Sequence, residues 1–547
     1  DSARFVSDYA TFDEMKAAAK DIAVREGEEG TVIMKNDNDV LPLSGKSVAL
    51  FGLAAYAPYP YAKGDLKAGN EDAVDLVQAF TDAGIEINQT VMDFYQKNIL
   101  NEHIEEVENK WTGEKEKQVA YDNIYVSAPG DMATYQINEV PPSEYESLGA
   151  PADWKSKIDK DETVGICVFA RGAGEGNTYA PGSATDRALS ADELAVVDAA
   201  KETCSQVVVL INSGNTMVLK EIAEGGAHEV DGIAYIGCLN DYQATGVVNV
   251  LTGKVNATGA LPDTYVADNA SIPAVMNFGG GYYADYESIG RNGDDPRYPG
   301  VEIANTEAGS FGGSDTYNGG TYVVEAEGIY VGYKYFETRY YDAVANPDSG
   351  ANSAAGATQA AAWDYNNEVL YDFGHGLSYL DYEQNLKSVE VDKTADGNIT
   401  AVVELKNNSD QDGTFLAQLY VQQPYTEYDK ENHVEKSAVM FLNSAKTEVA
   451  AGKTEEVTIP IPTKYLASYD YTNAKTYILD EGDYYFTAAA GSHEAVNNIL
   501  AEQGYTVKDG MDAEASGAVQ TWKLDEFDNT TFAVENGTEV TNVAEEA

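Results

Sequence analysis

Cysteine is scarce in this 547-residue chain, and its few histidines are scattered. The three cysteines are Cys167, Cys204 and Cys238, an odd number at core-like positions that argues against a disulfide framework. Neither a C-x-x-C nor an H-E-x-x-H motif occurs, and the five histidines show no metal-ligand spacing. We therefore expect no structural or catalytic metal, and we expect no other cofactor.

Basic residues are also few, with 35 Lys and Arg against 91 Asp and Glu, for a net charge of −56. Such a surface repels polyanions, so nucleic acid and anionic membrane surfaces are not expected partners. The charge fits a strongly solvated exported surface, or an acidic pocket for sugars or cations. No apolar run approaches the roughly 18–20 residues that a membrane-spanning helix needs.

The sequence begins at Asp1 rather than Met. We expect that processing or trimming removed the true start, together with any targeting signal. The acidic surface and the missing initiator Met favour an extracellular or cell-surface location, with a cytoplasmic location as the alternative.

One stretch, Thr163–Glu193, organises the rest of the chain. It opens with a buried-strand pattern at Val164–Ala170, continues into a glycine-rich loop that carries Glu175 between two glycines, and ends at a capping box formed by Ser190 and Glu193. Open α/β sheets place functional groups at the carboxyl ends of their strands. From the residues alone, Glu175 fits either a catalytic carboxylate or a solvated turn residue.

Other glycine-loop chemistry does not fit this stretch. Its glycines follow a G-x-G-x-G pattern rather than G-x-G-x-x-G, and the carboxylate of Glu175 would repel a pyrophosphate. The chain also contains no P-loop and no G-x-S-x-G elbow. Dinucleotide binding and serine-hydrolase chemistry are therefore not expected.

Strand patterns alternate with helix patterns through residues 1–277. We expect strands at 47–53, 164–170, 206–212 and 232–238, and helices at 12–30, 72–83, 216–224 and 242–252. In the first helix the predicted apolar face comprises Met15, Ala18, Ala19, Ile22 and Ala23. Such alternation predicts an α/β fold, a three-layer α/β sandwich with a largely parallel sheet, interrupted by a polar insertion at about 89–149.

The remaining sequence predicts a connecting region and an all-β domain. Residues 278–384 are rich in glycine, aspartate and tyrosine, with a low-complexity, mobile loop at 345–362 and a denser piece at 327–341 that we expect to lie against the first domain. Residues 385–547 contain short alternating runs typical of a β-sandwich. A helical insertion at about 492–515 and an acidic tail at 536–547 interrupt and end this pattern.

Six motifs, in order, resemble glycoside hydrolase family 3. They are EGTVIMKNDNDVLPL at 29–43, the GEG loop at 174–176 with a downstream L-S-x-x-E, LTGKVNATGALPDT at 251–264, EGIYVGYKYFETRYY at 327–341, DFGHGLSY at 372–379 and FLNSAKTEVAAGKTEEVTIPI at 441–461. The resemblance implies an α/β-sandwich domain followed by a fibronectin type III-like domain. It also implies a (β/α)₈ barrel with an Asp nucleophile, for which this chain has no motif, so the chain resembles the family members in which the barrel comes last.

By this resemblance Glu175 is the general acid/base of a retaining glycosidase. Such an enzyme needs two carboxyl groups about 5–5.5 Å apart, one to attack the sugar and one to protonate the leaving oxygen. Arg171 fits two roles equally, positioning a sugar hydroxyl or bracing the turn. Asp186 and Arg187 are expected to form a local ion pair.

The loop after the strand at 47–53 departs from the family pattern, because it carries the aromatic residues Tyr56, Tyr59 and Tyr61. Sugars stack on aromatic faces, so Tyr59 and Tyr61 are candidate ligands of an outer substrate subsite. An interface or core role for these tyrosines is the alternative.

Two hypotheses follow. In the first, the chain is the acid/base-bearing part of an exo-acting, β-glucosidase-like enzyme for β-linked oligosaccharides or glycosides. It is inactive alone and acts with a barrel supplied by a second subunit or by a continuation of the same chain. In the second, it is a non-catalytic carbohydrate-binding or cell-surface interaction module.

Overall fold

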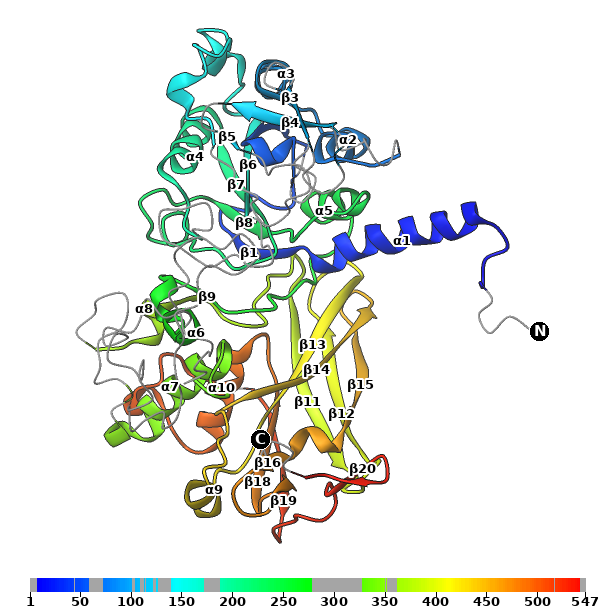
Figure 1. Cartoon of the computed structure of the whole chain (residues 1–547), viewed down its shortest axis with the longest axis vertical. Coiled ribbons are helices and arrows are strands. Elements are labelled where there is room, and N and C mark those ends of the chain that lie inside the picture. The colour runs from blue at the N-terminus through cyan, green and yellow to red at the C-terminus, as the bar shows by residue number, and fades with distance from the viewer. Residues whose placement is uncertain are drawn as a thin grey trace.

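The computed structural model arranges the chain as two domains, one above the other in Figure 1. The described residues are 7–43, 45–58, 72–100, 104–108, 113, 115–121, 124–125, 139–171, 187–277, 327–349, 351, 362–515 and 517–541. The predicted positions Tyr59, Tyr61, Glu175 and Asp186 lie outside these residues, as do residues 352–361 of the predicted mobile loop.

The first domain is built on a five-stranded sheet in the order β1-β8-β7-β6-β2. The strands are β1 (Val32–Asn36), β2 (Ser47–Phe51), β6 (Thr163–Arg171), β7 (Gln206–Ser213) and β8 (Gly232–Tyr235). Four of them are parallel, and β1 pairs antiparallel with β8 at the edge. All nine residues of β6 are buried, as expected for a strand covered on both faces. The predicted α/β class and largely parallel sheet are confirmed.

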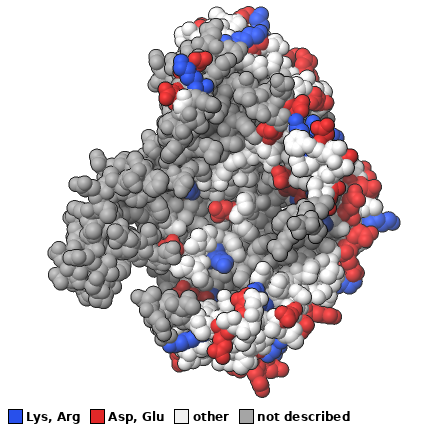
Figure 2. Space-filling view, turned by 45° about the vertical axis from the view of Figure 1, so that its right-hand side comes forward, with Lys and Arg blue, Asp and Glu red and all other residues white. Residues whose placement is uncertain are grey.

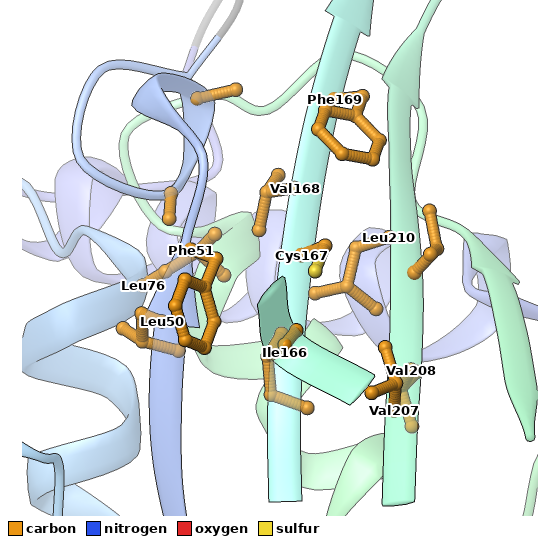
Figure 3. Close-up of a cluster of buried hydrophobic side chains, with 14 of the residues drawn as sticks. Leu50, Phe51, Leu76, Ile166, Cys167, Val168, Phe169, Val207, Val208 and Leu210 are labelled. Atoms are coloured by element: carbon orange, nitrogen blue, oxygen red, sulfur yellow. The ribbon is translucent and has the colours of Figure 1, made fainter. Parts of the chain in front are cut away.

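The core of this domain lies between the sheet and its helices. Figure 3 shows Phe51 of β2, Ile166 and Val168 of β6, and Leu210 of β7 beside one another, with Leu76 of α2 (Leu76–Asp82) next to them. All five side chains are almost fully buried. This packing holds the strands in register and so fixes where their carboxyl ends lie.

Helix α1 (Phe12–Gly30) contacts α5 (Gln243–Leu251) only near its own carboxyl end. The two backbones meet at Gly246, where a Cβ atom would lie 2.0 Å from the carbonyl oxygen of Val24. The amino-terminal half of α1 extends away from the domain (Figure 1), and Met15 and Ile22 are exposed. The predicted helix at 12–30 is confirmed, but of its apolar face only Ala23 is buried.

The predicted helix at 216–224 is also wrong, because this segment is a series of turns. Val218 forms an isolated parallel bridge with Ala188, and its N–H donates to the carbonyl oxygen of Arg187 at 3.0 Å. That extended pairing competes with helical hydrogen bonds, and the following Gly225, with φ of 73°, ends the segment in a turn. The predicted capping box of Ser190 and Glu193, in contrast, is confirmed, and it begins helix α4 (Ala191–Thr203).

The stretch predicted as an insertion divides into two parts. The strands β3 (Ile104–Glu108), β4 (Lys115–Tyr121) and β5 (Ile124–Tyr125) form a separate three-stranded antiparallel sheet. The flanking parts, which include α3 (Gln89–Asp93) and a π-helix (Phe94–Leu100), contribute to the core of the first domain. Tyr95 and Tyr145, from either side of the small sheet, are almost fully buried there.

The second domain is an antiparallel β-sandwich. One sheet contains β11 (Tyr382–Val391), β12 (Asn398–Asn407) and β15 (Thr454–Pro462); the other contains β14 (Met440–Val449), β13 (Gly413–Gln422), β18 (Gly482–Ala488) and β19 (Val519–Leu524). Helix α10 (Ser492–Glu502) lies between β18 and β19. Inward-facing apolar residues alternate with outward-facing polar ones along β12. The predicted all-β sandwich is confirmed.

The segment 372–379 joins the two domains. It follows β10 (Val369–Tyr371), which pairs with β9 (Tyr265–Val266) of the first domain. Its Leu377 donates a backbone hydrogen bond to Ile33 of β1 at 2.9 Å, and its His375 accepts one from Leu261 at 2.8 Å. Because the same segment leads directly into β11, the domains share a continuous hydrogen-bonded seam.

Helix α7 (Tyr333–Ala345) lies mainly against the second domain rather than the first. Its buried side chains Phe336, Tyr340 and Val344 belong to a cluster with Val496 and Ile499 of α10. The first domain reaches this cluster only through the end of its chain, near residue 266. The prediction that the segment 327–341 lies against the first domain is therefore corrected.

Candidate functional site

The carboxyl ends of β2, β6, β7 and β8 lie along one edge of the sheet, because these strands are parallel. Functional groups of open α/β sheets gather at this edge. β6 ends there at Arg171, immediately before residues 172–186, which contain Glu175. The chain returns to the described part at Arg187, three residues before the helix cap Ser190.

Arg171 and Glu193 form a buried, bidentate ion pair at this edge. Both guanidinium Nη atoms lie 2.7 Å from the two carboxylate oxygens of Glu193, and their side chains are 11% and 1% exposed. Arg171 also donates to the carbonyl oxygen of Ala188 at 2.8 Å, and Glu193 accepts the N–H of Ser190 at 2.7 Å. Paired, hydrogen-bonded charges of this kind are geometrically specific. These contacts join the end of β6 to the first turn of α4, and contact of Arg171 with a sugar hydroxyl stays a prediction.

A second buried carboxylate, Glu139, lies where β2 ends. It accepts the backbone N–H groups of Leu53 at 2.8 Å and Val140 at 3.0 Å, and the hydroxyl of Tyr95 at 3.4 Å. Tyr95 in turn shares a 2.6 Å hydrogen bond with Tyr145. Burial, together with the nearby charge of Glu193, raises the pKa of Glu139 to about 7. The group therefore titrates near neutral pH at the same edge as Arg171.

Sequence reasoning missed Glu139 because it lies in a segment read as a polar insertion. Its only local signal is that it stands before the apolar and proline residues V-P-P at 140–142. Tyr56, in contrast, is described and stacks on Tyr95 at a ring distance of 5.2 Å. Tyr56 thus follows the core alternative given for the tyrosines of its loop.

Glu139 predicts a pH dependence of stability. Its folded pKa is raised above the unfolded value of about 4.3, so the folded state holds the proton more tightly, and this residue's contribution falls as pH rises towards 7. The free energy of unfolding of the wild type should therefore fall between pH 5 and pH 8. In Glu139→Gln we expect this fall to be smaller by up to about 3 kcal/mol. Urea unfolding at both pH values measures this. The exposed Glu146→Gln is the control, and an unchanged pH slope in Glu139→Gln would contradict the assignment.

A third buried polar cluster lies between α7 and α10, away from the sheet edge. His493 bridges Glu337 and Asp512, with Nδ1 2.9 Å and Nε2 2.8 Å from their carboxylate oxygens. Tyr365 stacks on the imidazole at 3.8 Å and donates to Glu337 at 2.7 Å. The backbone N–H of His493 also donates to Asp372 at 2.9 Å. The cluster ties the connecting region to the second domain.

The carboxylates around His493 determine the direction in which its pKa is shifted. Burial alone lowers the pKa of His493, but the charge of Glu337 and the hydrogen bonds that the imidazole donates to both carboxylates outweigh it and raise the pKa to about 10. The imidazolium and its hydrogen bonds hold the pKa of Asp512 well below its usual range. Burial and the charge of Glu337 raise the pKa of Asp372 to about 6. His493 is therefore a cation at neutral pH.

Acidic side chains are spread over the face seen in Figure 2 rather than gathered in one patch. Within the described ranges, the structure contains no group of three or more His, Cys, Asp or Glu side chains arranged to hold a metal ion. No helix in those ranges has the length and apolar character to cross a membrane.

The fold and the sheet edge define a class of protein, an α/β sandwich carried on a fibronectin type III-like β-sandwich. Residues 31–333 match the glycosyl hydrolase family 3 C-terminal domain, and residues 416–492 match the fibronectin type III-like domain. The chain belongs to glycoside hydrolase family 3.

Curated relatives of the chain include β-glucosidases. The chain is 26% identical to a β-glucosidase of Ruminococcus albus over 487 residues, covering 86% of this chain and 39% of that protein. It is 25% identical to β-glucosidase A of Butyrivibrio fibrisolvens over 511 residues, covering 87% of this chain and 51% of that protein. The chain spans about half the length, or less, of these relatives.

Solved structures share the fold. A β-glucosidase from Paenibacillus barengoltzii matches with a TM-score of 0.61 at 21% identity, over 93% of this chain and 44% of that chain. β-Glucosidase 3B from Thermotoga neapolitana matches with a TM-score of 0.58 at 20% identity, over 95% of this chain and 56% of that chain.

Proposed function

We propose that this chain is the acid/base-bearing part of a retaining, exo-acting β-glycosidase for β-linked glucosides or oligosaccharides. A (β/α)₈ barrel, on a second subunit or in a continuation of the same chain, supplies the Asp nucleophile. Glu175 is the proton donor, and Tyr59 and Tyr61 contact the sugar beyond the cleaved bond. The protein acts outside the cell or at its surface.

The observation that carries this proposal is the position of Glu175 within the family match. It follows β6 of the family 3 domain in the sequence, and the buried Arg171–Glu193 pair joins the end of β6 to the first turn of α4. The relatives are named β-glucosidases, which supports the substrate class. A catalytic acid must be held accurately with respect to its substrate, and a clamp at the segment's base serves that purpose.

The chemistry requires both partners. The barrel carboxylate attacks the anomeric carbon while the glycosidic C–O bond breaks and Glu175 transfers its proton to the leaving oxygen. Water then attacks the glycosyl-enzyme, giving up its proton to Glu175 and releasing the barrel carboxylate. Each turnover returns Glu175 to its protonated form.

This division of labour predicts that the purified chain alone does not hydrolyse an aryl β-glucoside, because the nucleophile of the pair is missing. Release of nitrophenol from nitrophenyl β-glucoside should equal the buffer blank. Adding a protein that carries the barrel, or extending the chain with one, should restore turnover. Sustained hydrolysis by the chain alone would refute the proposal.

A further inference from the structure

A large open cavity lies in the second domain, away from the sheet edge of the first domain. Its volume is about 730 Å³, within the range of small-molecule sites in proteins. It is formed by the turn between β11 and β12, the first residues of β14, the short helical turn Thr463–Leu466, the strand β17 (Thr476–Ile478) and residues 532–536. None of these residues belongs to the proposed catalytic machinery.

The cavity combines an apolar floor with exposed phenol rings. Leu442 and Phe532 are buried in its floor. Tyr465 and Tyr477 line it and are 51% and 36% exposed, so part of each ring is open to the cavity. An aromatic ring offers an apolar face for stacking and, in tyrosine, a hydroxyl for hydrogen bonding.

Hydrogen-bonding groups complete the lining. Lys464 and Glu535 form an ion pair of 2.9 Å, with both side chains more than half exposed, so both keep hydrogen-bonding capacity for a ligand. The exposed side chains of Asp396 and Asn398 border the same space. The lining thus offers charged and neutral hydrogen-bonding groups and has no excess of positive charge. Such a lining suits a neutral polyhydroxylated ligand rather than an anion or a purely apolar ligand.

We propose that this cavity is a carbohydrate-binding site, in which pyranose rings stack on Tyr465 and Tyr477 while their hydroxyl groups bond to Lys464, Glu535 and Asp396. A pyranose presents an apolar C–H face beside its ring of hydroxyls, which is the combination that this lining matches. The choice of a β-linked gluco-oligosaccharide as its ligand rests on the proposed function, and the site holds this ligand without cleaving it. This binding is separate from the proposed hydrolysis, and the cavity binds its ligand whether or not Glu175 is the catalytic acid.

Binding of cellotriose to the chain, measured by isothermal titration calorimetry, tests the proposal. We expect saturable binding that weakens about tenfold in Tyr465→Ala and in Tyr477→Ala, the loss expected for one ring contact. Tyr471→Ala is the matched control, because Tyr471 is 53% exposed beside β17 but does not line the cavity. Its affinity should equal that of the wild type. Circular dichroism of each variant confirms that it is folded.

Three results would overturn the proposal. Cellotriose could fail to bind at millimolar concentration, or it could bind the two cavity variants as tightly as the wild type. The third is a self-associated chain that Tyr465→Ala converts to monomers, which would make the cavity a protein interface. A failure of Glu175→Gln to impair hydrolysis leaves the binding result unaffected, so the two proposals fail separately.

Discussion

In a protein that combines this chain with a barrel, Glu175→Gln should slow cleavage of a β-glucoside with an alkyl leaving group by about 10²–10⁴-fold. Glutamine keeps the size of the side chain but has no proton to give to a basic alkoxide oxygen. A dinitrophenyl leaving group needs no such proton, so formation of the glycosyl-enzyme from dinitrophenyl β-glucoside should remain close to the wild-type rate. Stopped-flow measurement of dinitrophenol release separates these steps.

Azide gives a second readout of the same variant. The glycosyl-enzyme of Glu175→Gln should accumulate, because no base activates water. Azide needs no deprotonation, so its nitrogen attacks the anomeric carbon, displaces the barrel carboxylate and forms a β-glycosyl azide. Product analysis by mass spectrometry detects it.

The control is Asp192→Asn, an exposed acid in the first turn of α4, which should leave both rates unchanged. If Glu175→Gln hydrolyses both substrate classes at the wild-type rate, Glu175 is not the acid.

The second large effect concerns stability. His493→Ala should destabilise the second domain by about 3–5 kcal/mol at pH 7. The side chain of Glu337 is 1% exposed, and the substitution leaves its charge buried without the imidazolium that compensates it. Urea unfolding followed by tryptophan fluorescence measures the loss.

A double-mutant cycle tests the cause of this loss. Glu337→Gln removes the uncompensated charge, so the double variant should be less destabilised than the sum of the single variants. Additive losses would show that the effect comes from lost packing instead.

The contribution of the His493–Glu337 pair to stability depends on pH. The folded pKa of His493 is raised, so its contribution is complete below about pH 6.5 and disappears as pH rises through about 10. The difference in unfolding free energy between wild type and His493→Ala should shrink from pH 7 to pH 10. A constant difference would contradict a charged His493.

The sequence predicted those parts of the fold whose local pattern agrees with their final surroundings. β6 and β7 read as buried strands because helices cover both of their faces, and Ser190 and Glu193 form a cap within a single turn. The family order of six motifs predicted both domain types. These signals require no knowledge of distant contacts.

Other features depend on partners far along the chain. The face of α1 that carries Met15 and Ile22 is apolar, but only the packing of α1 shows that these two side chains stay exposed. Val218 is held extended by Ala188, which no window around 216–224 reveals. Glu139 accepts a hydrogen bond from Leu53, 86 residues earlier in the chain, and Arg171 pairs with Glu193 at 2.7 Å. Neither contact can be read from a local window of the sequence.

The seam at 372–379 bears on how the chain is divided into units. The two family matches end at residue 333 and begin again at residue 416, so the seam belongs to neither. Yet Leu377 is bonded to Ile33 and the chain enters β11 five residues later. A fragment expressed separately should therefore include more of the chain than either family match covers. A cut at residue 333 would remove Leu377 and with it the backbone hydrogen bond to Ile33 of β1, whereas a cut at residue 416 would fall inside β13.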